Sequence, residues 1–396
     1  MRAKPLLAAL LALPLLALVD SCAEEPLASP PAAMAASAAA GQSLRVLIAS
    51  GGRALKLAAP GGLRLEDAEG RALFEIPGGG HASLKVAEGR LWAQETDLGA
   101  RKAWVKPRRE GEAILVSGRR YRGELTLLVD RESRPRLVNR VGLEAYLIGV
   151  LAAEVPPDWP LEALKAQAIA ARTYALYRAA HPDKGAQDWD LDDTTSSQVY
   201  GGAGREDART DRAVAETRGE VLLWKGELAQ TFFHSNCGGR TADVSRVWGG
   251  DVPYLRGVAC PYCRNDKHYA WQAELGLAKA GQALKDAGLC PSAELRGLEG
   301  VDEDSSGRLY RVRIIHGMGE SLVKASALRA ALGADVVRST RFEATISHGL
   351  LRLRGKGWGH GIGLCQEGAR GMAADGYPCR RILDFYFPGT QLARLR

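Results

Sequence analysis

Residues 142–178 read GLEAYLIGVLAAEVPPDWPLEALKAQAIAARTYALYR, and this stretch decides the centre of the fold. Apolar residues recur at helical spacing over 143–155, and two prolines then end the helix. A second, alanine-rich helix follows to about residue 180, and its small side chains allow close packing on a neighbour. The pattern therefore predicts two packed helices joined by a tight turn, with Glu154 at the end of the first.

Glu154 is a candidate proton donor. A carboxyl group near a helix C-terminus feels the negative end of the dipole, which disfavours ionisation, and an apolar wall would raise its pKa further. A glutamate kept protonated in this way can act as a general acid on a glycosidic oxygen. On pattern alone, a solvated glutamate that simply ends a helix is the stronger interpretation.

The rest of the folded chain indicates an α+β protein, with a β-rich core, packed helices and a substrate cleft. Its 396 residues are enough for a real hydrophobic core. We divide the folded part into a β-rich region, a region with the chemical motifs, a mixed α/β segment and a glycine-rich cleft region, over 44–139, 140–263, 264–345 and 346–396. Further helices are expected near 205–217, 275–287, 325–332 and 365–375.

The N-terminus predicts export. A basic start precedes an apolar run over 5–19, which is too short for a comfortable transmembrane helix and typical of a signal peptide. Cys22 then stands as the lipidated residue of a bacterial lipoprotein, after a signal peptide of residues 1–21. Asp20 is atypical before such a site, so an ordinary cleaved signal is the alternative.

Residues 22–43 predict a lipidated cysteine followed by a flexible tether, because Ala, Pro and Ser dominate them. We therefore expect an extracytoplasmic protein of the cell envelope, anchored to the membrane by an N-terminal lipid. The net charge of +7 suits a polyanionic surface or a scattered surface charge. No Lys/Arg run with interleaved aromatics appears, so a nucleic-acid partner is not expected.

A second candidate site consists of two short pairs, His234-x-x-Cys237 and Cys260-x-x-Cys263. Their spacing fits a tetrahedral zinc site of the Cys₃His type, which would be structural because four protein ligands close it. An oxidising compartment favours disulfides instead, and the spacing leaves both interpretations open. Three further cysteines receive no role: Cys290, Cys365 and Cys379.

Two further segments offer groups for binding a sugar. In GKGWGHGIGLCQEGARGMAADGY (355–377), closely spaced glycines permit a tight backbone, and three side chains could line a cleft: Trp358, His360 and Gln366. In DDTTSSQVYGG (192–202), Gln198 and Tyr200 add hydrogen-bonding groups. A packed turn and an ordinary polar loop are the plainer interpretations.

In their order along the chain, these motifs resemble the stage II sporulation protein D family, also called the amidase-enhancer family. The resemblance covers roughly residues 44–393. The segments that carry it are AYLIGVLAAEVPPDWPLEALKAQAIAARTYAL, SSQVYGG, FFHSNCGGRT, PYLRGVACPYC, LRAALGADVVRSTRF and GWGHGIGLCQEGARGMAADGYPCRRILDFYFPGT.

The resemblance implies a peptidoglycan lytic transglycosylase. Such an enzyme cleaves the bond between N-acetylmuramic acid and N-acetylglucosamine in strands without stem peptides, and it leaves a 1,6-anhydro end. The family's catalytic glutamate falls on Glu154, and its zinc ligands fall on His234 and Cys237 with some of Cys260 and Cys263. The implied partner is the glycan strand. The alternatives are a non-catalytic glycan-binding protein that stimulates an amidase and, more weakly, a zinc hydrolase.

Overall fold

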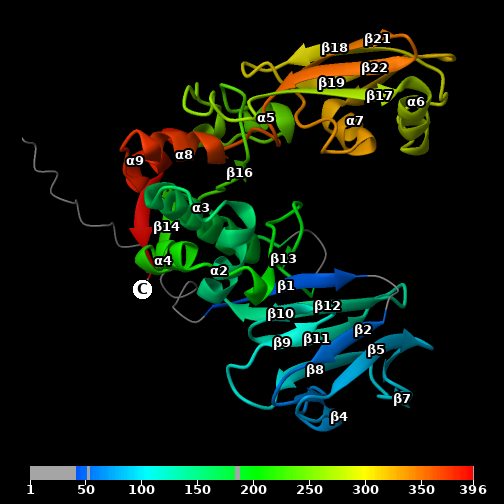
Figure 1. The fold of residues 1–396 in the computed structure, drawn as a ribbon, viewed down its shortest axis with the longest axis vertical. Coiled ribbons are helices and arrows are strands. Elements are labelled where there is room, and N and C mark those ends of the chain that lie inside the picture. The colour runs from blue at the N-terminus through cyan, green and yellow to red at the C-terminus, as the bar shows by residue number, and fades with distance from the viewer. Residues whose placement is uncertain (1–41, 51–53, 183–187, 396) are drawn as a thin grey trace, which may run out of the picture.

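The structure is a computed structural model that describes residues 42–50, 54–182 and 188–395. The predicted signal peptide, Cys22 and nearly all of the tether lie outside the described residues. Within the part that is described, no helix has both the length and the apolar character needed to cross a membrane. Helices and strands occur together in several sheets, which confirms the α+β class (Figure 1).

The N-terminal part of the described chain is β-rich, as predicted. It forms a seven-stranded sheet in the order β13-β1-β12-β11-β8-β3-β4 and a six-stranded sheet in the order β10-β9-β2-β5-β6-β7. Alternating side chains of these strands are buried, and they form one core. The strands are β1 (Ser43–Ser50), β2 (Leu55–Ala58), β3 (Leu63–Glu66), β4 (Ala72–Ile76), β5 (His81–Ala87), β6 (Arg90–Ala93), β7 (Thr96–Asp97), β8 (Lys102–Pro107), β9 (Ile114–Val116), β10 (Arg119–Tyr121), β11 (Glu124–Val129), β12 (Pro135–Gly142) and β13 (Leu191–Asp192).

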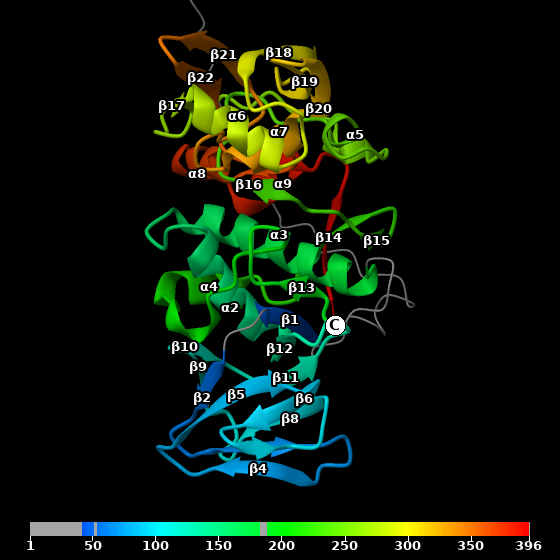
Figure 2. The ribbon, with the colours of Figure 1, turned by 90° about the vertical axis from the view of Figure 1, so that its right-hand side faces the viewer.

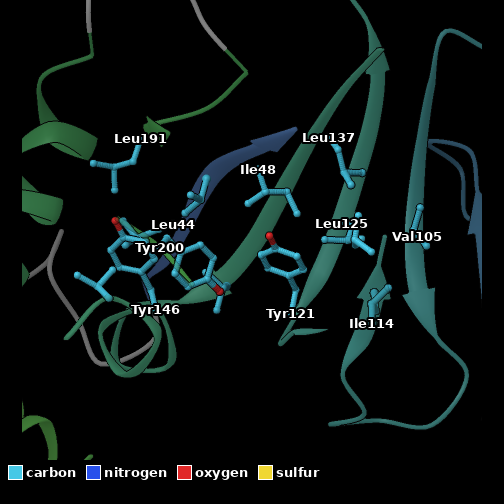
Figure 3. Close-up of a cluster of buried hydrophobic side chains, with 14 of the residues drawn as sticks. Leu44, Ile48, Val105, Ile114, Tyr121, Leu125, Leu137, Tyr146, Leu191 and Tyr200 are labelled. Carbon is cyan, nitrogen blue, oxygen red and sulfur yellow. The ribbon is translucent and has the colours of Figure 1, made fainter. Parts of the chain in front are cut away.

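Two helices follow where the sequence predicts them, α2 (Leu143–Glu154) and α3 (Leu161–Ala180). Helix α3 is buried on most sides, because it packs against α2, α4 (Ala208–Glu216), α8 (Gln366–Ala374), α9 (Cys379–Tyr386) and β14 (Glu220–Trp224). Its many alanines make this close packing feasible. A tyrosine cluster joins the helices to the sheets: Tyr146 of α2 and Tyr121 of β10 both pack on Tyr200 (Figure 3).

The following elements form a middle layer of the protein, and they come from segments far apart in sequence. The last strand β24 (Gln391–Arg394) pairs with β14 (Glu220–Trp224), which also pairs with β15 (Glu227–Leu228). Strand β16 (Phe233–His234) runs parallel to β23 (Leu364–Cys365) and thereby brings the glycine-rich segment against residues 232–239. Three helices belong here: α5 (Val244–Val247), α8 (Gln366–Ala374) and α9 (Cys379–Tyr386).

A third region lies at the end opposite the N-terminal sheets (Figures 1 and 2). It has its own core between two three-stranded sheets and two helices. The predicted mixed segment continues to Lys356, because β22 pairs with both β17 and β21. Its elements are β17 (Ala270–Gly276), α6 (Leu277–Asp286), β18 (Leu295–Glu303), β19 (Leu309–His316), β20 (Gly319–Lys324), α7 (Ala325–Leu332), β21 (Phe342–Ser347) and β22 (Leu350–Lys356).

Candidate functional site

Glu154 is the last residue of α2 and is partly buried. Burial raises the pKa of its carboxyl group above the ordinary glutamate value. Two hydrogen-bond donors act against this rise: the backbone N–H of Val199, which donates to Oε1 at 2.7 Å, and the side-chain amide of Gln366. The net shift is upward, as expected of a general acid.

Gln366 is the first residue of α8, and its side chain is only 6% exposed. Its Nε2 makes no hydrogen bond of normal geometry within the described chain, although it lies near enough to Glu154 to favour the ionised carboxylate. A buried amide donor without a partner is costly. This amide is therefore a donor available to the Glu154 carboxylate.

A cavity of about 500 Å³ adjoins the two segments that hold Glu154. Ala153 precedes the glutamate and Val199 bonds to it, and both line the cavity. The remaining lining residues are Gly118, Arg119, Arg120, Asp193, Tyr200, Gly201, Ala203, Gly204 and Arg205. Glu154 itself is not among the lining residues, so the cavity combines arginine residues that suit an anionic ligand with a carboxyl group of raised pKa behind its wall.

Asp193 is a second acid of this cavity, and sequence reasoning missed it. Burial raises its pKa to about 6, while Arg119, with Nη1 3.5 Å from the carboxylate, opposes the rise and neighbouring Asp192 adds to it. A larger cavity, of about 700 Å³, lies in the third region between β17 and β21–β22. No predicted site residue lines that larger cavity.

Gln198 and Tyr200 use their polar groups within the protein. The Gln198 side chain is fully buried, accepts a hydrogen bond from Tyr146 (3.0 Å) and donates one to the carbonyl of Ala171 (3.2 Å). The Tyr200 hydroxyl donates to Asn139 at 2.9 Å. Both side chains therefore hold the loop that presents the Val199 N–H to Glu154, so any contribution to glycan binding would be indirect.

Trp358 and His360 lie in the glycine-rich segment as predicted, but their rings have partners in the protein. The Trp358 ring contacts His268 and lies under the Arg338 guanidinium. Nε2 of His360 donates to the carbonyl of Phe233 at 2.9 Å, and burial lowers the His360 pKa to about 3. The imidazole of His360 is therefore neutral and fixed, and the half-exposed Trp248 ring packs against it at a tilt of 43°.

Four buried cysteines converge in the middle layer: Cys237, Cys260, Cys263 and Cys365. Their sulfur atoms all lie within 4.8 Å of one another. Three of the four predicted ligands are thus brought together, and Cys365 takes the place predicted for His234. Four thiols in such a cluster fit the tetrahedral Cys₄ coordination of a structural zinc ion.

His234 lies outside the cysteine group, which corrects the Cys₃His interpretation. Its Nδ1 donates to the carbonyl of Ile362 at 3.1 Å, so the ring turns toward the glycine-rich backbone. Burial lowers the pKa of His234 well below its ordinary value, and the ring is neutral. Its Nε2 has no partner among the described residues.

The glycines of the segment are required by this packing. A β-carbon on Gly359 would lie 2.8 Å from the His234 side chain, and one on Gly361 would collide with the Arg308 guanidinium. A β-carbon on Gly368 would lie 2.7 Å from the sulfur of Cys260 and would collide with the hydroxyl of Tyr386. The glycine-rich segment therefore closes tightly over the cysteine cluster, and α8 begins directly from it.

Comparisons with known proteins agree with this arrangement. Residues 131–224, which contain α2, α3 and Glu154, match the family described as stage II sporulation protein. Stage II sporulation protein D of Bacillus amyloliquefaciens is 30% identical over 65% of this chain and 75% of its own length. The chain belongs to the stage II sporulation protein D family.

Two further relatives extend the match. A protein of Brachyspira hyodysenteriae described as uncharacterized is 35% identical over 78% of this chain and 82% of its own length. The amidase enhancer of Bacillus subtilis is 28% identical over 81% of this chain. The alignment spans 51% of that enhancer, so its name describes a protein about half of which has no counterpart here. The family resemblance inferred from the motifs is thus confirmed.

Proposed function

We propose that this protein is a peptidoglycan lytic transglycosylase in which Glu154 acts first as general acid and then as base. The observation that carries this proposal is the raised pKa of a partly buried carboxyl group beside a cavity. Its substrate would be glycan strands without stem peptides, whose muramic acid carries a free carboxylate. Arg120 and Arg205 of the cavity lining would suit that anion.

The reaction needs one acid that works twice. Glu154 gives its proton to the oxygen that links muramic acid to the next glucosamine, and the bond from that oxygen to C1 breaks. The C6 hydroxyl of the same muramic acid then attacks C1, and its proton passes to the Glu154 carboxylate. The acid is regenerated and the product is a 1,6-anhydro end. No water is activated, so the second carboxylate of ordinary glycosidases is not required.

Gln366 and Val199 would serve this cycle by stabilising the ionised form of the Glu154 carboxylate. The Val199 N–H donates to Glu154, the Gln366 amide lies close to the same carboxylate, and both lower a pKa that burial raises. Too high a pKa would leave Glu154 a poor acid toward the glycosidic oxygen. The two donors therefore set the balance between the acid and base steps.

The role of Gln366 predicts a specific kinetic signature. Gln366→Leu removes the amide donor, so we expect the turnover rate to fall about 10- to 100-fold, the usual worth of a hydrogen bond to a charged group. The loss of this donor also raises the pKa of Glu154, so the alkaline limb of the pH–rate profile should move to higher pH. A rate that falls with an unmoved limb would show that Gln366 does not act on Glu154.

A non-catalytic enhancer of an amidase is the alternative, favoured by the name of the B. subtilis relative. The two functions separate when the purified protein is incubated with peptide-free strands and, in parallel, with whole cell wall plus a peptidoglycan amidase. A transglycosylase gives anhydro ends from peptide-free strands without the amidase. A pure enhancer gives none and only accelerates the amidase.

We further propose that Cys237, Cys260, Cys263 and Cys365 hold a structural zinc ion. Support comes from the closeness of the four sulfur atoms and from two N–H groups, those of Cys237 (3.2 Å) and Gly368 (3.3 Å), that donate to the Cys365 sulfur. A bound zinc would fix the start of α8, where Gln366 stands next to Cys365. It would have no open position, which argues against the zinc hydrolase. Two disulfides among the same four residues are the alternative.

The place of action follows from the same proposal. Peptidoglycan lies outside the cytoplasmic membrane, so the protein would be exported by its N-terminal segment and held by a lipid on Cys22. The net charge of +7 would favour approach to an anionic wall polymer.

A further inference from the structure

Arg308 is a buried arginine of the third region that reaches the cysteine cluster. It follows the turn between β18 and β19, and only 2% of it is exposed. Its Nη1 donates to the carbonyls of Cys237 (3.1 Å) and Arg240 (3.3 Å) and to the hydroxyl of Ser306 (3.4 Å). Its Nε and Nη2 have no hydrogen-bond partner in the described chain.

No carboxylate pairs with the Arg308 side chain among the described residues. Asp304 is the nearest acid to act on it, but the Asp304 carboxylate accepts hydrogen bonds from the N–H groups of Ser306 (2.9 Å) and Asp243 (3.3 Å). Arg172, which is also buried, has such a partner. Its guanidinium donates to the two carboxylate oxygens of Glu144 at 2.8 and 3.0 Å. A buried cation without such a partner costs several kcal/mol.

The cysteines provide the missing negative charge. The Arg308 guanidinium lies against Cys237, because its Nη1 donates to the carbonyl of that cysteine at 3.1 Å. Zinc binds cysteine as thiolate, so a divalent ion with four thiolates leaves a net charge of −2 in the core. Gly361 lies against the guanidinium, where any side chain would collide with it. The core is therefore shaped to admit this cation beside Cys237.

We propose that Arg308 is the counter-charge of the metal-loaded four-cysteine centre, and that metal binding thereby holds the third region on the rest of the protein. This inference depends on a metal at the four cysteines and not on the transglycosylase reaction. Two neighbouring contacts strengthen the same junction: Arg341 donates to the carbonyl of Gly238 (2.8 Å), and Arg240 donates to Ser305 (3.2 Å).

The test compares Arg308→Met with Arg308→Lys in the mature full-length protein. Zinc affinity is measured by competition with a chromogenic chelator, and thermal unfolding is followed with and without zinc. We expect Arg308→Met to bind zinc at least 10-fold more weakly, the typical cost of losing a group that supports metal ligands. We expect Arg308→Lys, which keeps the charge, to retain most of the affinity.

The sign of the stability effect separates this role from simple packing. Without zinc the Arg308 guanidinium has no hydrogen-bonded carboxylate among the described residues, and Asp304 acts on it only through space, so Arg308→Met should leave the melting temperature unchanged or raise it. With zinc the same change should lower it. The matched control is Arg329→Met, which removes a partly buried arginine of α7 bonded to the Val337 carbonyl and should lower both melting temperatures without changing zinc affinity. Equal destabilisation of both forms by Arg308→Met, or an unchanged zinc affinity, would overturn the proposal.

Discussion

Glu154→Gln is expected to lower the rate of anhydro-end formation by about 10²- to 10⁴-fold, the usual contribution of a positioned general acid and base. Glutamine keeps the size and the hydrogen-bonding capacity of the side chain but cannot give up a proton. Binding of the glycan strand should therefore persist. The measurement is mass spectrometry of the products from peptide-free strands, together with a binding assay on the same strands.

The same substitution should stabilise the fold, with a definite pH dependence. The pKa of Glu154 is raised in the folded protein, so its protonated form is favoured there and stability is lost as pH rises through that raised pKa. Glutamine cannot ionise, so the melting temperature of Glu154→Gln should exceed that of the wild type increasingly as pH rises above the ordinary glutamate range.

Glu144→Gln is the matched control for this prediction, because it makes the same change on the same helix. Glu144 neutralises the buried Arg172, so its replacement should lower stability while leaving the chemical step in place. If Glu154→Gln retained full activity, or if it destabilised the protein as Glu144→Gln does, Glu154 would not be the acid of this site.

The second large effect is expected at the cysteine cluster. Cys260→Ser should abolish stoichiometric zinc binding and leave the middle layer unfolded at ordinary temperatures. A structural zinc site is worth about 10–16 kcal/mol in small zinc-binding peptides, which is comparable to the whole stability of a typical domain. The measurements are zinc content by emission spectroscopy and thermal unfolding by circular dichroism.

Cys290→Ser is the control for the cluster. Cys290 is buried but lies apart from the four sulfurs, and its thiol donates to the carbonyl of Ser292 at 3.2 Å. Its replacement should keep zinc and fold. If the wild type instead contained no zinc and titrated four fewer free thiols than its cysteine count, the cluster would hold two disulfides.

Local patterns predicted the elements that carry Glu154. The apolar spacing and the prolines of 142–178 determine where α2 and α3 begin and end, and these bounds are as expected. Glu154 lies at the end of α2, as expected, and it is partly buried where a solvated side chain was the plainer interpretation. The helix bounds and the position of Glu154 depend on residues that are close in the sequence, which is why the sequence could predict them.

The fourth cysteine could not be found in this way. His234 and Cys365 are partners in the register of β16 and β23, so the same pairing brings both beside the other cysteines. Which of the two faces the cluster depends on backbone contacts between distant segments, such as the hydrogen bond from His234 to Ile362. The short spacing between His234 and Cys237 favoured the wrong ligand. For the right ligand, the sequence offered only the presence of Cys365, beside Gln366 in the glycine-rich segment.

The polar loop around Gln198 shows a second limit. Its composition indicated hydrogen-bonding groups, which are present, but not their partners. Gln198 bonds to Tyr146 and to a backbone carbonyl of α3, and Tyr200 bonds to Asn139 of β12. The group that reaches Glu154 is a backbone N–H. Backbone donors carry no signature in side-chain patterns, so only the folded arrangement reveals Val199.

The central claim is that the muramic C6 hydroxyl, and not water, attacks C1 of the muramic acid after Glu154 has protonated the glycosidic oxygen. Digestion of peptide-free glycan strands in ¹⁸O-labelled water, with mass spectrometry of the new ends, tests it directly. Our account predicts anhydro ends that carry no ¹⁸O and disappear with Glu154→Gln. New reducing ends labelled with ¹⁸O, or no new ends from the wild-type protein, would contradict it.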